Sequence, residues 1–217
     1  MRQTSHCASK SNRLLGAVAK RALDVSVACL AIVLLAPLML VLAGLVWSII
    51  GGPVIFRQKR VGRGGRLFTC FKFRSMPIDA EEILRRHLAA DPAAAREWEE
   101  RRKLRNDPRI GSFARAMRRS SLDELPQLVN VLRGDMSLVG PRPVVPEEME
   151  RYGRHATAYC STRPGLTGLW QVSGRSRVSY AARIARDRYY VRHWSFWLDI
   201  IVLLRTVLAV ASFDQAS

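Results

Sequence analysis

Acidic residues are scarce in this chain of 217 residues. It has 18 aspartates and glutamates against 35 lysines and arginines, a formal net charge of +17. Such an excess indicates an acidic partner: a nucleic acid, an anionic membrane surface or a phosphorylated small molecule. Hydrophobic residues make up 48% of the chain, which excludes an intrinsically disordered protein. The charge by itself does not choose among the three partners.

Cysteine and histidine are also few and scattered. The four cysteines form no CxxC pair, and the four histidines form no metal-binding pattern. A disulfide framework and a zinc site are therefore excluded, and the spacing is typical of a protein from a reducing compartment. The chain has neither a Walker phosphate loop nor a GxSxG nucleophile elbow. The cysteines are Cys7, Cys29, Cys70 and Cys160.

One long hydrophobic run is present. No charged residue occurs from Val25 to Phe56, and residues 25–50 are almost entirely apolar. About 20 such residues are enough to cross a bilayer as a helix. A secretory signal would have a shorter apolar core followed by a small-residue cleavage site, which is missing here. The run therefore predicts a segment that meets lipid.

Pro37 and the charges on either side decide how this segment is expected to enter the membrane. Proline removes one helical hydrogen bond and clashes with the preceding turn. Basic residues flank the run at both ends, within 13–21 and 57–63. Because basic residues prefer the cytoplasmic side, both ends are expected on the same face. This predicts a re-entrant helix–break–helix with Pro37 at the break; a straight or kinked single-pass helix is the alternative.

The rest of the chain predicts a soluble part of mixed α+β class, mainly helical. Residues 53–56 and 67–76 are expected to form a small β-hairpin, joined through glycines. In the second strand, apolar Phe71 and Phe73 alternate with basic Lys72 and Arg74, so one face should be basic.

Two further segments have helical composition. Residues 79–104 should form a helix interrupted near Asp91 and Pro92, to which we assign no chemistry. Residues 194–211 are apolar, with two tryptophans, and are broken by Asp199 and Arg205. They predict a helix lying at the membrane interface, with a buried core helix as the alternative.

The pair Asp123–Glu124 stands in a strongly basic stretch. Two adjacent carboxylates can hold Mg²⁺, and the surrounding guanidinium groups match phosphate oxygens in geometry. Ser121 followed by Glu124 also fits a capping box, so the pair is expected at a helix start, where the helix dipole favours ionised carboxylates. Two bland alternatives stay open: Glu124 only caps the helix, and Asp123 pairs with Arg119. The basic residues nearby are Arg115, Arg118, Arg119, Arg133 and Arg142.

Two loops could support such a site. Pro141 and Pro143 restrict the backbone on both sides of Arg142, and a rigidly presented arginine suits phosphate binding, although a structural ion pair would use the same arrangement. The glycine-rich loop 163–175, with Gln171 and Arg175, would let backbone approach a ligand or would simply turn the chain.

Taken in order, seven stretches resemble the bacterial sugar transferase family, the monotopic polyprenyl-phosphate phosphoglycosyl transferases. The resemblance covers about residues 18–210, and the short form is most similar to the exopolysaccharide priming enzymes. One departure is Ala36–Pro37, where the family usually has Ser-Pro. The stretches are KRALD (20–24), the apolar run with Pro37, PVIFRQKRVG (53–62), FKFRSM (71–76), NDPRIG (106–111), SLDELPQLVNVLRGDMSLVGPRP (121–143) and RPGLTGLWQVSGR (163–175).

The resemblance implies a reaction. Asp123 would be the nucleophile that takes a hexose-1-phosphate, galactose or glucose, from a UDP-sugar with release of UMP. Glu124, with Asp123, would hold Mg²⁺, and undecaprenyl phosphate would be the acceptor. The expected substrate- and phosphate-binding residues are Lys72, Arg74, Arg118, Arg119, Arg142, Gln171 and Arg175.

The resemblance also implies a domain organisation. A polar tail (1–18) and a membrane-inserted segment (19–56) would precede a cytoplasmic catalytic domain (57–217), at the bacterial inner membrane. Nucleic acid is not an expected partner, and neither the sugar nor the oligomeric state can be read from the sequence. A non-enzymatic basic membrane adaptor and a diphosphate-sugar hydrolase are the competing hypotheses.

Overall fold

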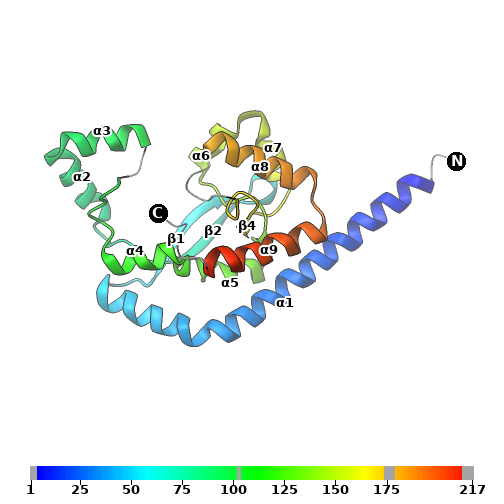
Figure 1. Cartoon of the computed structure of the whole chain (residues 1–217), viewed down its shortest axis with the longest axis horizontal. Helices are drawn as coiled ribbons and strands as arrows, with labels where there is room; N and C mark the ends of the chain where they lie inside the picture. The colour runs from blue at the N-terminus through cyan, green and yellow to red at the C-terminus, as the bar shows by residue number, and fades with distance from the viewer. Residues whose placement is uncertain (1–3, 102–103, 174–178, 212–217) are drawn as a thin grey trace.

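The structure is a computed structural model that describes residues 4–101, 104–173 and 179–211. Helix α1 (Thr4–Ile49) is 46 residues long and contains Pro37. It is continuous in secondary structure where the sequence predicted a helix–break–helix, and it takes in most of the expected polar tail. Figure 1 shows that α1 bends strongly in its light-blue part. A proline removes one hydrogen bond of the ladder, which permits such a bend without ending the helix.

The surface of α1 is strongly apolar. Residues Gly16–Ile49 are long and apolar enough to cross a membrane by length and composition. Val33, Leu34, Leu40 and Trp47 have exposed fractions between 67% and 74%, far above what packing in a soluble core would leave. An apolar surface of this size marks a contact with lipid or protein.

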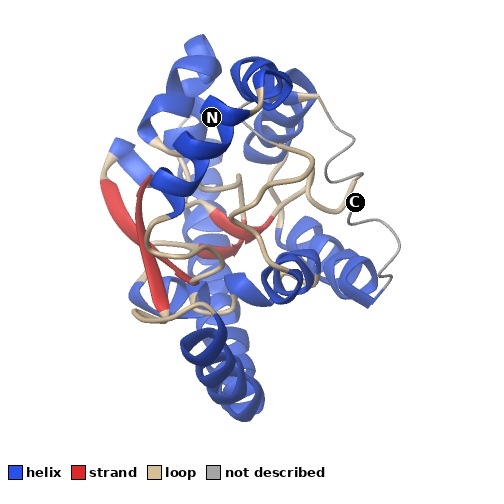
Figure 2. Cartoon of the chain, turned by 90° about the vertical axis from the view of Figure 1, so that its left-hand side faces the viewer, coloured by secondary structure: helices blue, strands red, loops and turns tan. Residues whose placement is uncertain are grey.

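The expected hairpin is present. Strands β1 (Ile55–Val61) and β2 (Leu67–Phe73) pair antiparallel, with Gln58 opposite Cys70. A second small sheet pairs β3 (Ser137–Val139) with β4 (Gly165–Thr167) in parallel. Figure 2 shows both pairs of strands among the surrounding helices.

Helices α2 (Ala80–Ala90) and α3 (Pro92–Arg101) form the expected interrupted helical segment. The interruption is at Asp91, whose carboxylate accepts hydrogen bonds from the backbone N–H groups of Ala93 and Ala94. Figure 1 shows this pair of helices standing apart from the rest of the molecule.

The other helices surround the small sheets. Helices α4 (Ser112–Arg119) and α5 (Gln127–Arg133) flank the acidic pair. Helices α6 (Pro146–Tyr152), α7 (Ala156–Cys160) and α8 (Tyr180–Arg192) lie together on one side of the molecule (Figure 1).

Helix α9 (Phe196–Ala211) divides into a buried and an exposed face. Asp199 and Val202 are buried, whereas Trp197, Leu204 and Leu208 are 62% to 73% exposed. One face therefore packs on the protein, and the other exposes an apolar stripe. Figure 1 shows that the helix runs beside part of α1.

The KRALD segment fastens α1 to the rest of the protein. Lys20 forms an ion pair with buried Asp199 at 2.6 Å and donates to the Val139 carbonyl at 3.0 Å. Arg21 donates to the carbonyls of Val131 and Leu132 at the end of α5. Asp24, also buried, accepts from the Leu138 backbone N–H at 2.9 Å. Removing one partner from such buried contacts would leave a charge uncompensated, so these contacts are costly to break.

Candidate active site

The acidic pair lies in a short 3-10 turn, η2 (Leu122–Glu124), directly before Pro126 and α5. The predicted capping box is wrong. Ser121 has a left-handed backbone, with φ 59°, and its side chain makes no capping bond. The Glu124 carboxylate is turned toward basic side chains. A side chain engaged in two ion pairs does not reach back to cap its own turn.

Glu124 is the meeting point of two cations. Its Oε1 lies 2.7 Å from Lys72 Nζ and 3.2 Å from Arg142 Nη2. Burial would raise the pKa of this carboxyl, but the charges and hydrogen bonds of Arg142 and Lys72 outweigh it and hold the pKa at about 2. Glu124 is therefore ionised at every physiological pH.

Asp123 is in a different environment, although it is adjacent. It is 8% exposed, and none of the residues that the structure describes donates a hydrogen bond to its carboxylate. Burial, followed by the charge of Glu124, raises the pKa of Asp123, and the charges of Lys72, Arg118 and Arg142 oppose the rise. The alternative in which Asp123 pairs with Arg119 is not observed. Two carboxylates with opposite pKa shifts are typical of a catalytic pair.

Arg142 follows a backbone segment that is held by two hydrogen bonds to strand β4. Gly140 N–H donates to the Thr167 carbonyl at 2.9 Å, and the Pro141 carbonyl accepts from Gly165 N–H at 2.8 Å. A Cβ on Gly165 would lie 2.1 Å from the Gly140 nitrogen, so glycine is required there. The guanidinium also lies 6.0 Å from the centre of the Trp170 ring.

Of the other arginines predicted to bind phosphate, Arg118 lies near the acidic pair, whereas Arg119 and Arg74 make contacts elsewhere. Arg118 donates to Ser75 Oγ at 2.8 Å, and its charge acts on Asp123. Arg119 lines a shallow surface groove with Ser112 and Arg115. Arg74 donates to the Pro53 carbonyl and lies against the Phe56 ring.

The glycine-rich loop is described only in part. Gln171 Nε2 donates to the Leu166 carbonyl at 3.2 Å, and its buried Oε1 has no partner among the described residues. No contact of Gln171 with the acidic pair is observed. Arg175 lies outside the described residues.

Sequence reasoning gave Arg60 and Trp170 no role in the site. Arg60 donates to the Pro143 carbonyl, one residue after Arg142. The guanidinium groups of Arg142 and Arg183 lie 6.0 Å and 4.6 Å from the centre of the Trp170 ring. The alternation of side chains along β1 could have indicated Arg60. With the register of the hairpin, it places Arg60 on the same face as Lys72.

The two carboxylates of the acidic pair could bind Mg²⁺ only if substrate phosphates and water supplied the other ligands. Among the described residues no group of three or more His, Cys, Asp or Glu side chains could hold a metal. Asp123 and Glu124 supply carboxylate oxygens, and magnesium commonly binds one or two carboxylates plus substrate phosphates and water. The pair is therefore compatible with this ion and unsuited to an all-protein metal cage.

Comparison with known proteins gives consistent matches. A family model described as bacterial sugar transferase matches residues 15–213. The undecaprenyl-phosphate galactose phosphotransferase of Salmonella typhimurium is 47% identical over 219 residues, covering 100% of this chain and 44% of that protein. The exopolysaccharide production protein ExoY of Sinorhizobium fredii is 46% identical over 198 residues, covering 91% of this chain and 88% of that protein.

A third relative has a glucose substrate in its name. The UDP-glucose:undecaprenyl-phosphate glucose-1-phosphate transferase of Caulobacter vibrioides is 40% identical over 205 residues, covering 91% of this chain and 71% of that protein. The chain thus spans less than half of the Salmonella relative and most of the rhizobial one.

Proposed function

This chain belongs to the bacterial sugar transferase family, as its sequence predicted, and we propose that it transfers a hexose-1-phosphate from a UDP-sugar to undecaprenyl phosphate. The Salmonella relative is named for galactose and the Caulobacter relative for glucose, so these two hexoses are the proposed cargo. The product would begin an exopolysaccharide repeat unit, in keeping with the name of the rhizobial relative.

The observation that carries the proposal is the contrast between the two carboxylates. Asp123 is buried and takes no hydrogen bond from the described residues, so its oxygens are available to a phosphorus atom. Glu124 is held by ion pairs with Lys72 and Arg142. In the proposed complex these two cations would stabilise the negative charge of the diphosphate. An ionised carboxylate is an established nucleophile in group transfer.

The proposed chemistry has two displacements at one phosphorus. Asp123 attacks the β-phosphorus of the UDP-sugar, the bridging P–O bond breaks, and UMP leaves with the bonding electrons. A phosphosugar then remains on Asp123. An oxygen of undecaprenyl phosphate attacks the same phosphorus, Asp123 departs as a carboxylate, and a diphosphate-linked sugar is formed. Arg142, Lys72 and Arg118 would bind the phosphate oxygens throughout.

Mg²⁺ is the proposed cofactor. Asp123 and Glu124 would hold it together with phosphate oxygens, and the ion would neutralise charge on the diphosphate. The two carboxylates, rather than a larger ligand set, make the site dependent on substrate for complete coordination.

The membrane arrangement is proposed from the apolar surfaces. The exposed residues of α1 and the exposed stripe of α9 would meet the same leaflet. With basic residues at both ends of its apolar run, α1 would enter and leave by the cytoplasmic face of the inner membrane, bending near its middle. The active site would then lie where a soluble nucleotide-sugar and a membrane-bound acceptor can meet.

A UMP-release assay tests the proposal. Purified protein in detergent receives undecaprenyl phosphate, Mg²⁺ and a panel of UDP-sugars. We expect UMP with UDP-galactose or UDP-glucose, and its loss in Asp123→Asn. Asp79→Asn is the matched control, because Asp79 is exposed and makes no capping bond.

The outcomes separate the competing functions. Full activity of folded Asp123→Asn would refute the nucleophile. Free hexose-1-phosphate as the product, in place of a lipid-linked sugar, would indicate a hydrolase. No UMP from any donor, together with binding to anionic vesicles, would favour a basic membrane adaptor.

A further inference from the structure

Arg60 lies on the face of the β-hairpin that meets the active site. The register pairs Phe56 with Lys72 and Arg60 with Phe68. Side chains alternate along a strand, and directly opposed residues share a face. Arg60 therefore projects from the same face as Lys72, the residue that reaches Glu124.

The Arg60 guanidinium joins two groups. Nη1 donates to the Pro143 carbonyl at 3.0 Å, and Nη2 donates to Gln58 Oε1 at 2.6 Å. Nε is buried and has no acceptor among the described residues. Burial, followed by the charge of Arg142, lowers the pKa of Arg60. Burying a second cation close to Arg142 has a desolvation and repulsion cost, and a functional role for Arg60 would explain why it is kept.

The acceptor on Pro143 explains what Arg60 can do. Pro141 and Pro143 have no N–H, so the backbone of each proline can be held by a hydrogen bond only through its carbonyl. The Pro141 carbonyl accepts from Gly165 N–H at 2.8 Å, and the Pro143 carbonyl accepts from Arg60. These two hydrogen bonds hold the backbone before and after Arg142, whose Nη2 lies 3.2 Å from Glu124 Oε1.

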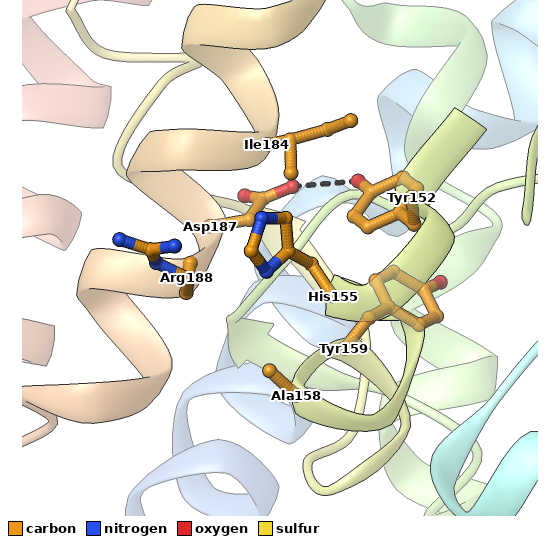
Figure 3. Close-up of a pocket in the computed structure, with 7 residues that line it drawn as sticks. All are labelled: Tyr152, His155, Ala158, Tyr159, Ile184, Asp187 and Arg188. Carbon is orange, nitrogen blue, oxygen red and sulfur yellow. Dashed lines mark hydrogen bonds between the residues drawn. The ribbon is translucent and has the colours of Figure 1, made fainter.

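The segment just after Pro143 is tied to the same end of the hairpin. Val61 N–H donates to the Val144 carbonyl at 2.9 Å. The Tyr159 hydroxyl donates to the Val61 carbonyl at 2.9 Å and accepts from Val144 N–H at 3.2 Å. Figure 3 shows this hydroxyl pointing away from Asp187, whereas the Tyr152 hydroxyl points toward it. These hydrogen bonds hold the end of the hairpin, which carries Arg60, against the segment that follows Pro143.

We propose that Arg60 is a positioning residue for Arg142: by holding the Pro143 carbonyl, it keeps the Arg142 guanidinium at Glu124 and at the phosphates of the donor. This inference rests on the proposed function for its substrate. Arginine suits this role better than lysine, because two nitrogens of one planar fork donate separately to Gln58 and Pro143, whereas a lysine would have to serve both acceptors from one nitrogen.

The adjacent residue provides a matched control. Lys59 is exposed, projects from the other face of β1, and donates to Thr69 Oγ1 at 3.1 Å. Lys59→Met and Arg60→Met remove one positive charge from neighbouring positions of one strand. We expect kcat/KM for UMP release to fall about tenfold or more in Arg60→Met and by less than about twofold in Lys59→Met. Arg60→Lys should be intermediate, because it keeps the charge and loses the fork.

A double-mutant cycle separates positioning from simple stabilisation. If Arg60 acts through Arg142, then Arg60→Met added to Arg142→Gln should lower kcat/KM by less than about twofold further. If Arg60 only stabilises the fold, its effect should be the same in both backgrounds and should follow the melting temperature. That result, or equal activity of Arg60→Met and Lys59→Met, would overturn the inference.

A separate measurement of UDP binding tests the role of Arg60 without depending on turnover. Calorimetry with UDP in Mg²⁺ should show weaker binding in Arg60→Met and Arg142→Gln and unchanged binding in Lys59→Met. If the wild-type protein releases no UMP, the proposed function fails while UDP binding still decides the role of Arg60. Equal UDP affinity in Arg60→Met and wild type would then refute it.

Discussion

Lys72 Nζ lies 2.7 Å from Glu124 Oε1, and this contact joins strand β2 to the turn that holds the acidic pair, 52 residues further along the chain. Both side chains are largely removed from solvent, with 18% and 16% of their surfaces exposed. A charge pair in such surroundings is costly to break, because the remaining partner keeps its desolvation penalty. The hairpin is therefore part of the candidate active site.

Replacing Lys72 should have a much larger effect than replacing its neighbour on the same strand. Lys72→Met leaves the buried Glu124 with one cation fewer, and we expect kcat/KM to fall about 10²-fold. Arg74 is an exposed donor to the Pro53 carbonyl, so Arg74→Met should stay within about threefold of wild type. The UMP-release assay measures both. Equal losses in the two variants would contradict the separation seen in the structure.

Asp123 should control the acid side of the pH–rate profile. Its pKa is raised by burial and by Glu124, and a protonated carboxyl cannot attack phosphorus. Activity should therefore fall as the pH drops through this raised pKa, whereas Glu124, with a pKa of about 2, stays ionised. Measuring kcat/KM from pH 4 to 8 at fixed Mg²⁺ should give a limb of unit slope.

Arg118 provides the check on that assignment. Its charge opposes the rise of the Asp123 pKa, so Arg118→Met should move the acid limb to higher pH by up to about one unit. A limb that stays in place, or moves to lower pH, would show that another group controls the profile.

The sequence predicted the elements that depend on local signals. The hairpin, the interruption at Asp91 and the apolar helix follow from alternation, a proline and hydrophobicity, and all three are present. The helix-breaking effect of Pro37 was overestimated, because a long apolar helix can bend at proline while its other hydrogen bonds persist.

Within the site, the sequence could identify residue types but not the direction of each side chain. Ser121 and Glu124 fit a capping box in spacing, yet the left-handed backbone at Ser121 and the ion pairs of Glu124 arise from contacts with β2 and the Arg142 loop. Arg74 and Lys72 looked equivalent for the same reason. Arg60 was missed because its role depends on a carbonyl 83 residues away.

Asp187 should make the stability of the protein depend on pH with an unusual sign. It is 3% exposed, accepts from the Tyr152 hydroxyl at 2.8 Å, and burial raises its pKa from 3.8 to about 7. The folded state then binds a proton that the unfolded state releases, so this contribution is fully present below pH 3.8 and is lost as the pH rises toward 7. Over that window the loss is about 4 kcal/mol at most.

Two asparagine variants measure this effect. The melting temperature of Asp187→Asn relative to wild type should increase as the pH is raised from 4 to 8. Asp107→Asn should show almost no trend between pH 4 and 8, and its melting temperature should gain on wild type only as the pH falls below 3.8. Burial would raise the Asp107 pKa, but its hydrogen bonds to Arg109 at 2.6 and 2.8 Å lower it, so its stabilisation is lost in acid. The same trend in both variants would refute the assignment for Asp187.

The membrane arrangement can be tested at the two ends of the apolar run of α1. In a re-entrant helix both ends lie in the cytoplasm, and in a single-pass helix they lie on opposite sides. Single cysteines at the exposed positions Ala17 and Arg66, in a protein whose own cysteines are replaced, should both react with a membrane-impermeant thiol reagent only after the inner membrane is opened. Labelling at position 17 alone in intact spheroplasts would establish a single-pass helix. Pro37→Ala should raise labelling at position 17, because it restores the hydrogen bond whose loss permits the bend.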